Sequence, residues 1–399
     1  MFKLSRNLKA LPAYLFVEID KAKRKARAEG RDIIDLGIGD PDLPASRHII
    51  EKLYQAAQDP LNHRYALDQG MPLLRQAIAK WYLRRFGVKL DADTEILPLI
   101  GSKEGIAHLP LAFLNPEDYS LVPDPCYPPY KSGTILAGGR PYLMPLLEEN
   151  DFLPDLDKIP SNIRRKSRLL YINYPNNPTS ATAEKPFYQE VLNFAVKNKL
   201  IVVSDLAYSE MGYDGYQASS FLELKGATAQ AIEFHSLSKT YNMTGWRIGW
   251  ACGNAKLISA LAKVKSNIDS GVFLAIQVAA IAALEGPEML QRQMRQVYQE
   301  RRDTLVRGLE RLGWRVKPPK ATFYLWLKIP YAACCKKTRS SGSRCCNSLD
   351  FAAFLLDKAN LIVTPGVGFG KSGEGYIRMA LTVGKDRIQE AVNRLKKIL

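Results

Sequence analysis

Two serines and a lysine stand together directly after a short apolar run of the sequence. The segment reads Ser236-Leu-Ser238-Lys239, and Arg247 follows eight residues after the lysine. A lysine amine can form an imine with an aldehyde, serine hydroxyls can donate hydrogen bonds to a phosphate, and an arginine can hold a phosphate through two parallel hydrogen bonds. These residue types could therefore bind a phosphorylated aldehyde, although the tetrapeptide alone is more often an ordinary loop.

Two further segments carry polar side chains suited to the ring of such an aldehyde. Asp205 ends the run Leu200-Ile-Val-Val-Ser-Asp205, and Tyr208 follows it. A carboxylate can pair with a protonated pyridine nitrogen and so keep the ring electron-withdrawing, while Tyr208 could reach the ring's phenolic oxygen. Asn177, in Tyr174-Pro-Asn-Asn177-Pro-Thr-Ser180, could donate to that oxygen and to a substrate carboxylate. Taken singly, Asp205 could instead cap a helix, and the Asn-Pro segment could be a turn.

Two more segments offer a phosphate contact and an aromatic ring. Gly101-Ser102-Lys103 stands between an apolar run and a helical pattern, and free backbone N–H groups at a helix start bind phosphate well. Tyr127 lies in Pro125-Cys-Tyr127-Pro-Pro-Tyr130, where an aromatic side chain could stack on a pyridine ring. Each of the five segments has an ordinary explanation when taken alone, but one binding site would account for all five.

The five segments follow strands that alternate with helices through the middle of the chain. Most of the strand candidates are short apolar runs with little polar alternation, as is typical of strands buried on both faces. This pattern predicts an α/β fold with a mainly parallel sheet covered by helices, in which ligands bind at the carboxyl ends of the strands. The expected strands are 95–101, 119–123, 169–174, 200–205, 231–236 and 247–252, and helices between them include 103–114, 184–198 and 255–265.

A change of pattern after Gly286-Pro287 predicts a second domain. A long, charged, amphipathic helix is expected from there to about Leu312, followed by further strands and helices. The residues before the first large-domain elements are too few to fold alone, so we expect them to join this smaller domain. The expected division is an N-terminal arm and part of the small domain in 1–45, a large domain carrying the site in 46–286, and a small C-terminal domain in 287–399.

The order and spacing of these motifs resemble a known enzyme family. Asn-Asn-Pro-Thr at 176–179, Asp-x-x-Tyr at 205–208 and Ser-x-Ser-Lys…Arg at 236–247 occur as in the fold-type I, class I/II aminotransferases, and the resemblance covers nearly the whole chain. It implies a fold-type I α/β architecture with a large domain that binds pyridoxal 5'-phosphate (PLP) and a smaller α/β domain. It also implies a homodimer with shared active sites, and amino acid and 2-oxo acid substrates.

The resemblance also implies roles for individual residues. Lys239 would carry PLP as a Schiff base and later move a proton from the substrate. Arg378, in Gly375-Tyr-Ile-Arg378-Met-Ala, would bind the α-carboxylate of the substrate, and Gly39, in Leu36-Gly-Ile-Gly39, would contact it through its backbone. Tyr65 would reach the phosphate of the neighbouring subunit's cofactor.

Within this family, four segments are similar to the LL-diaminopimelate aminotransferases. The resemblance implies amino transfer between tetrahydrodipicolinate and LL-diaminopimelate with glutamate as donor, a step of lysine biosynthesis. It makes Tyr14 a candidate substrate contact. The segments are Leu8-Lys-Ala-Leu-Pro-Ala-Tyr14-Leu-Phe-Val-Glu-Ile-Asp, Asp35-Leu-Gly-Ile-Gly39-Asp-Pro-Asp, Ser102-Lys103 and Thr364-Pro-Gly-Val-Gly-Phe-Gly370.

Two positions depart from that pattern where the distal end of the substrate would bind. Asp68, in Tyr65-Ala-Leu-Asp68-Gln-Gly70, stands where a glutamate is expected, and Leu274 stands where an asparagine is expected. Asp68 could bind the distal ammonium of diaminopimelate, or it could cap a helix that begins near Met71. Aminotransferases for alanine, aspartate or aromatic substrates therefore stay open as alternatives, as do PLP-dependent β-lyases and decarboxylases.

Composition and charge argue against nucleic acid, membrane and metal as partners. The formal net charge is +16, but the basic residues are scattered, which predicts a solvated surface and no nucleic-acid partner. A DNA-binding regulator on this fold would need an attached domain, for which the residues before Leu36 are too few. No secretory pattern and no apolar stretch of roughly 18 residues occurs, so we expect a cytoplasmic protein without a membrane partner. The vicinal pairs Cys334-Cys335 and Cys345-Cys346 lack the usual CxxC spacing, so we expect no metal.

Overall fold

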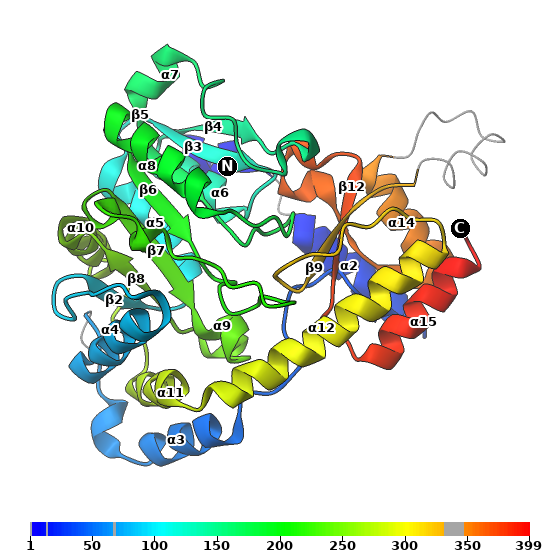
Figure 1. Ribbon diagram of the computed structural model, residues 1–399, viewed down its shortest axis with the longest axis horizontal. Helices are drawn as coiled ribbons and strands as arrows, with labels where there is room; N and C mark the ends of the chain where they lie inside the picture. Colours follow the sequence, from blue (N-terminus) through cyan, green and yellow to red (C-terminus); the bar gives the residue numbers. More distant parts are fainter. Residues whose placement is uncertain (1, 13–14, 67–68, 331–346) are drawn as a thin grey trace.

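A seven-stranded sheet forms the centre of the larger part of the protein (Figure 1). The computed structural model describes residues 2–12, 15–66, 69–330 and 347–399. The strand order is β2-β8-β7-β6-β5-β3-β4, and every strand runs in the same direction except β8, which is antiparallel to both of its neighbours. The strands are β2 (Ile96–Leu99), β3 (Tyr119–Asp124), β4 (Arg140–Pro145), β5 (Ser167–Ile172), β6 (Ile201–Asp205), β7 (Ala231–Ser236) and β8 (Gly249–Gly253).

Helices cover both faces of this sheet, which explains why its strands read as continuous apolar runs. Along β5, Leu170 lies in a core shared with helices α4, α8 and α11, whereas its neighbour Tyr171 lies in a core shared with α5 and α10. Alternate residues of one strand thus enter different cores. The helices of this part are α3 (Arg47–Ala57), α4 (Pro72–Phe86), α5 (Ser102–Phe113), α6 (Pro129–Leu136), α7 (Ser161–Lys166), α8 (Lys185–Asn198), α9 (Leu237–Thr240), α10 (Ala255–Lys265) and α11 (Leu274–Glu285).

The predicted α/β fold with a mainly parallel sheet is confirmed. The six expected strands are present, and their ends differ from the predicted ones by no more than a few residues. Strand β4, which carries Pro141 and Pro145 and pairs with β3 alone, was not predicted from the sequence. Proline cannot donate a backbone hydrogen bond, so it is tolerated at a sheet edge but obscures the strand pattern.

A smaller part of the protein is built from the two ends of the chain. Strand β1 (Ile34–Asp35) pairs in parallel with β10 (Leu361–Ile362), and a three-stranded sheet has the order β11-β12-β9. Strand β12 carries Arg378. We keep the division 1–45, 46–286 and 287–399 as a proposal. The remaining elements are β9 (Tyr324–Lys328), β11 (Thr364–Pro365), β12 (Tyr376–Ala380), α14 (Ser348–Ala359) and α15 (Lys385–Lys396).

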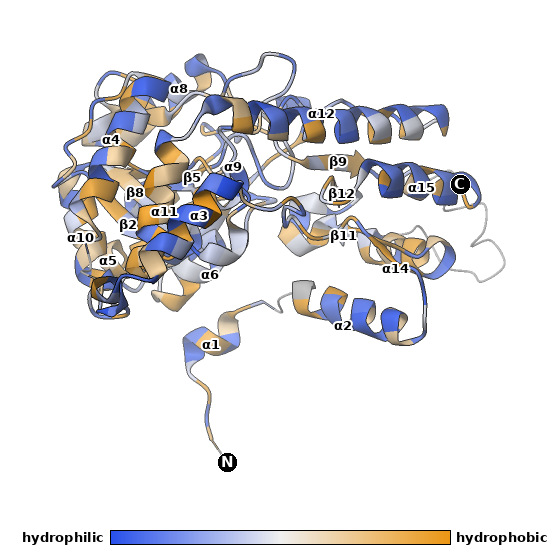
Figure 2. Cartoon of the chain, turned by 90° about the horizontal axis from the view of Figure 1, so that it is seen from below, coloured by the Kyte–Doolittle hydropathy of each residue, from blue (hydrophilic) through white to orange (hydrophobic). Residues whose placement is uncertain are grey.

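One long helix connects the two parts. Helix α12 (Glu288–Arg311) begins beneath the large sheet and runs into the smaller part, where it packs on α15 (Figure 1). Figure 2 shows that polar residues dominate the surfaces of α12 and α15, and that α1 (Arg6–Ala10) and α2 (Leu15–Ala28) lie below the body of the protein. Within the described parts of the chain, none of the helices combines the length and apolar composition that a membrane crossing requires.

Candidate active site

A cavity of about 340 Å³ lies at the carboxyl ends of the parallel strands, between the two parts of the protein. Its walls come from all five segments that the sequence analysis singled out, together with the β1 side and β12. The structure therefore brings together side chains that are far apart in the sequence. The predicted residues that line it are Gly39, Ser102, Lys103, Tyr127, Asn177, Asp205, Tyr208, Ser236, Ser238, Lys239, Arg247 and Arg378.

Lys239 lies in the short helix α9 directly after β7, and its amine reaches across the cavity. Its Nζ donates a 2.7 Å hydrogen bond to the backbone oxygen of Gly39. Burial is the main cause that lowers the pKa of Lys239 to about 8; Asp40 opposes the shift, and the positive charges of Arg378 and Arg247 add to it. A larger share of this amine is therefore unprotonated near neutral pH than for an exposed lysine, which suits imine formation and proton transfer.

Asp205 is the last residue of β6 and is buried below the cavity. Its Oδ2 accepts a 2.7 Å hydrogen bond from the hydroxyl of Tyr130, while its buried Oδ1 has no hydrogen-bond partner among the described residues. Burial raises the pKa of Asp205 to about 6, against hydrogen bonds from Tyr130 and the amide of Ala207. A buried carboxylate oxygen that lines a cavity fits the protonated nitrogen of a pyridine ring, so this residue matches the expected PLP.

The phosphate end of PLP is matched by a helix start, two serines and an arginine. Helix α5 begins at Ser102 after Gly101, which has a φ of +72° and no side chain to cap the first amides. A Cβ atom on Gly101 would lie 2.4 Å from Nη2 of Arg247, so glycine is required for that guanidinium to reach the helix start. Ser236 caps α9 by accepting a 3.1 Å hydrogen bond from the amide of Ser238. These donors surround a position suited to a phosphate group.

Arg378 faces the cavity from strand β12 of the smaller part. Its Nη1 donates a 2.7 Å hydrogen bond to Oδ1 of Asn177, and its Nη2 donates a 2.9 Å bond to the oxygen of Gly37. The guanidinium also lies 4.1 Å from the ring centroid of Tyr324 and 4.6 Å from that of Phe369. These contacts fix the plane of the guanidinium, which is what bidentate binding of a carboxylate requires.

The structure adds site residues that the sequence analysis did not assign. Asn173 donates a 2.7 Å hydrogen bond to the backbone oxygen of Asp205, and its Oδ1 accepts from the amide of Asn177. Tyr324 lines the cavity and shares a 2.9 Å hydrogen bond with the hydroxyl of Tyr208. Asn173 directly follows β5, at the strand end next to that of Asp205, and that position could have indicated it. Tyr324 gave no comparable signal, because its strand lies in the other part of the protein.

Two residues named from the sequence, Tyr65 and Leu274, do not line this cavity in the described chain. Tyr65 is 90% exposed on the surface, and Leu274 begins helix α11 without lining the cavity. Tyr14 and Asp68 lie outside the described residues, as do both vicinal cysteine pairs.

One group of metal-ligand types occurs among the described residues. Ligand atoms of Glu104, His108 and Asp269 lie within 4.8 Å of one another. The fully buried Lys265 already bonds this group, because its Nζ lies 3.2 Å from Oε2 of Glu104 and 2.5 Å from Oδ1 of Asp269. An ammonium group thus neutralises the carboxylates that a metal ion would need.

Comparisons with known proteins agree with this geometry. A model of the family "Aminotransferase class I and II" matches residues 31–395. The LL-diaminopimelate aminotransferase of Moorella thermoacetica is 53% identical over 395 residues, which cover 99% of this chain and 98% of that protein. A substrate-bound structure of BacF from Bacillus subtilis has a TM-score of 0.92 at 37% identity and covers 100% of this chain and 98% of that one. A probable N-succinyldiaminopimelate aminotransferase from Thermus thermophilus has a TM-score of 0.88 at 37% identity, covering 96% of this chain and 100% of that one.

Proposed function

Because the chain belongs to the class I and II aminotransferases, which are PLP-dependent enzymes, we propose that it transfers an amino group between LL-diaminopimelate and a 2-oxo acid. The observation that carries the substrate is the full-length relationship to enzymes named for this reaction, at about half identity. We propose that glutamate and 2-oxoglutarate form the other substrate pair, with tetrahydrodipicolinate as the acceptor. The reaction would then belong to lysine biosynthesis.

The residues of the cavity account for how PLP would be held. The N-terminus of α5, Ser236, Ser238 and Arg247 would bind its phosphate, and Tyr127 would contact its ring. Asp205 would hold a proton on the ring nitrogen through its buried Oδ1. When bound, PLP supplies a carbonyl carbon that receives the amino group and a ring that accepts electron density.

Lys239 would both bind the cofactor covalently and move the proton. Its amine lies in a buried position with a pKa lowered to about 8, so it can lose and regain a proton near neutral pH. In the structure it bonds the backbone oxygen of Gly39, which holds the side chain on the side of the smaller part. From this place Lys239 would take the proton from the α-carbon of the amino acid and deliver it to the cofactor.

Arg378 and Asn177 would orient the amino acid. The guanidinium of Arg378 is fixed by Asn177 and Gly37, so it would bind the α-carboxylate in one plane. A bound carboxylate places the α-carbon at a constant distance from Lys239, which favours proton transfer. Tyr208, whose hydroxyl shares a hydrogen bond with that of Tyr324, would reach the phenolic oxygen of the cofactor ring.

A homodimer is part of this proposal. Tyr65 is 90% exposed, Phe2 at the N-terminal arm is fully exposed, and Leu111 and Ile268 form an apolar surface together with Ala260. Such surface side chains favour association between copies of the chain. The partner's Tyr65 would reach the cofactor phosphate, so the site would be complete only in the dimer. We also propose a cytoplasmic location, because the described cysteines, Cys126 and Cys252, are both free.

The test is an amino-transfer assay with purified protein. LL-diaminopimelate and 2-oxoglutarate should be converted with a higher kcat/KM than alanine, aspartate or phenylalanine with the same acceptor. Because the cavity residues serve every amino acid alike, the panel tests the substrate and not the fold. Faster turnover of any of the three competing donors would reject diaminopimelate as the substrate and leave the aminotransferase assignment standing.

A further inference from the structure

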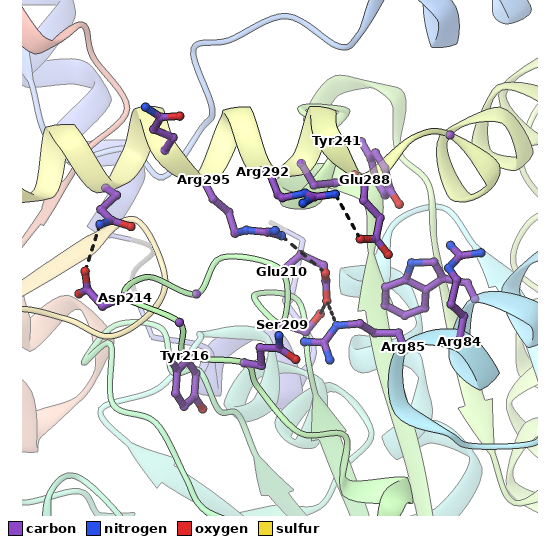
Figure 3. Close-up of a pocket in the computed structure, with 18 residues that line it drawn as sticks. Arg84, Arg85, Ser209, Glu210, Asp214, Tyr216, Tyr241, Glu288, Arg292 and Arg295 are labelled. Carbon is purple, nitrogen blue, oxygen red and sulfur yellow. Dashed lines mark hydrogen bonds and ion pairs between the residues drawn. The ribbon is translucent and has the colours of Figure 1, made fainter.

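A second cavity, of about 500 Å³, is lined by Ser209 and Glu210, which directly follow Tyr208 in the chain. Figure 3 shows the side chains that line it. It is enclosed by helix α4, the first turns of α12 and residues 209–217. Arginines line it from both helices: Arg84 and Arg85 from α4, and Arg292 and Arg295 from α12. None of these residues belongs to the active-site cavity.

Four arginines line this cavity against three carboxylates, those of Glu210, Asp214 and Glu288. Glu210 is shared by two arginines, because its Oε1 lies 2.9 Å from Nε of Arg85 and its Oε2 lies 4.0 Å from Nη1 of Arg295. Figure 3 shows these two arginines approaching Glu210 from opposite sides. Asp214 also lines the cavity but is bound by Arg302, at 2.6 Å. The carboxylates therefore leave part of the arginine charge uncompensated.

Arg84 and Arg292 are the arginines most available to a ligand. The Nη2 of Arg84 donates a 2.9 Å hydrogen bond to the backbone oxygen of Leu284, and no carboxylate among the described residues pairs with it. Arg292 is 69% exposed, and its only carboxylate contact in the described chain is a 4.0 Å approach to Glu288. Guanidinium groups in a concave site bind carboxylate and phosphate groups through paired hydrogen bonds.

We propose that this cavity binds a small molecule with two or more carboxylate or phosphate groups, held between the arginines of α4 and those of α12. The cavity has the volume of a small-molecule site. A ligand with a single negative charge would satisfy the arginines of one helix only. A ligand with several charges bridges both helices and so fixes α12 against the large domain.

The cavity shares its wall with the active site. Tyr208 lines the active-site cavity, whereas the next residues, Ser209 and Glu210, line the second one. Ser209 lies 2.7 Å from Nε2 of the buried His235, which directly precedes the phosphate-site residue Ser236. Because the hydroxyl of Ser209 also donates a 3.1 Å hydrogen bond to Oε1 of Glu210, a ligand that moves Glu210 would be expected to affect the segments that carry the cofactor site.

Helix α12 provides a second connection. Arg301, farther along this helix, binds Asp42 through two hydrogen bonds of 2.6 and 2.9 Å. Asp42 lies three residues after Gly39, whose backbone oxygen accepts the hydrogen bond of Lys239. A ligand that holds α12 in place would thus also hold residues 39–42 next to the active site. It is therefore expected to change the KM for the amino donor.

Calorimetric titration of the PLP-loaded enzyme tests the proposal, with citrate as the tricarboxylate probe and pyrophosphate as the phosphate probe. One probe should bind with one site per chain. The double variant Arg84→Gln/Arg292→Gln should weaken this binding at least tenfold, because two charge-assisted contacts are lost. The matched control is Lys80→Gln/Arg311→Gln, which removes two charges from the same helices outside the cavity and should change the affinity by less than twofold.

The outcomes separate the sources of an anion signal. Binding of citrate alone indicates a polycarboxylate ligand, and binding of pyrophosphate alone indicates a phosphorylated one. Failure of both probes to bind, or equal weakening in the two double variants, overturns the proposal. Loss of binding in Arg378→Lys also overturns it, because the probe would then occupy the active site. A bound probe that leaves the KM for the amino donor unchanged overturns the coupling through α12.

Discussion

Replacing Arg378 with lysine tests the central contact of the proposed site. The guanidinium is held by Asn177 and Gly37 at 2.7 and 2.9 Å, and it lies between the rings of Tyr324 and Phe369. A lysine keeps the positive charge but offers a compact ammonium in place of a planar fork. It can neither form two parallel bonds with a carboxylate nor fill the space between the two rings.

The size of the effect follows from the contacts that are lost. One charge-assisted hydrogen bond contributes about 1.5–3 kcal/mol. The stacked cation–π contacts add about 0.5–1 kcal/mol. The amino acid should therefore bind about 2–4 kcal/mol more weakly, which corresponds to a loss of about 30- to 700-fold in affinity. Binding of PLP should be unchanged, because Arg378 lies on the smaller part and not at the phosphate-binding residues.

The assay is a titration of the visible absorbance of the PLP-loaded enzyme with glutamate and with LL-diaminopimelate. The apparent dissociation constants of the variant are compared with those of the wild type, and bound PLP is measured in parallel. An amine without a carboxylate serves as the control, since its reaction should be equally slow in both proteins. If Arg378→Lys bound both amino acids within twofold of the wild type, the α-carboxylate would have to be bound elsewhere.

Three other residues give sharp expectations. Lys239→Ala should abolish turnover and the covalent attachment of PLP, and borohydride reduction of the wild type should label this lysine and no other. The rate at which the wild-type apoprotein takes up PLP should rise as the pH rises through about 8, because the amine must be unprotonated. Asp205→Ala should retain part of the PLP but lose turnover by roughly 10²–10³-fold, and near wild-type rates would show that the nitrogen pairing is absent. Asp124→Ala should raise the KM for amino acids and leave the PLP content unchanged. Oδ2 of Asp124 accepts hydrogen bonds of 3.0 Å from the amide and 2.8 Å from the hydroxyl of Ser372, and so holds the loop that places Phe369 against Arg378. An unchanged KM would show that this loop does not affect substrate binding.

The sequence predicted the parts of the site that follow strands. A buried strand is recognisable as an apolar run, and in a parallel sheet its carboxyl end has a known location. Asp205, Asn177, Tyr127 and Lys239 could therefore be placed at one edge of the sheet from the sequence alone. The sequence did not indicate that Tyr130 binds Asp205 or that Tyr324 binds Tyr208, because these contacts depend on side-chain directions across the fold.

The basic residues also form a cluster that depends on the fold and could not be predicted from the sequence. The basic residues are scattered along the sequence, which predicts a uniformly solvated surface. In the folded chain, however, Arg84 and Arg85 line the same cavity as Arg292 and Arg295, although about half of the chain separates the two pairs. The two pairs meet because α12 begins beneath the large sheet, next to α4, before it enters the smaller part. A cluster that needs two distant helices cannot be recognised by counting charges in a window. It becomes visible only when the start of α12 is placed, and its position across the wall from Tyr208 is what makes it a candidate for control of the active site.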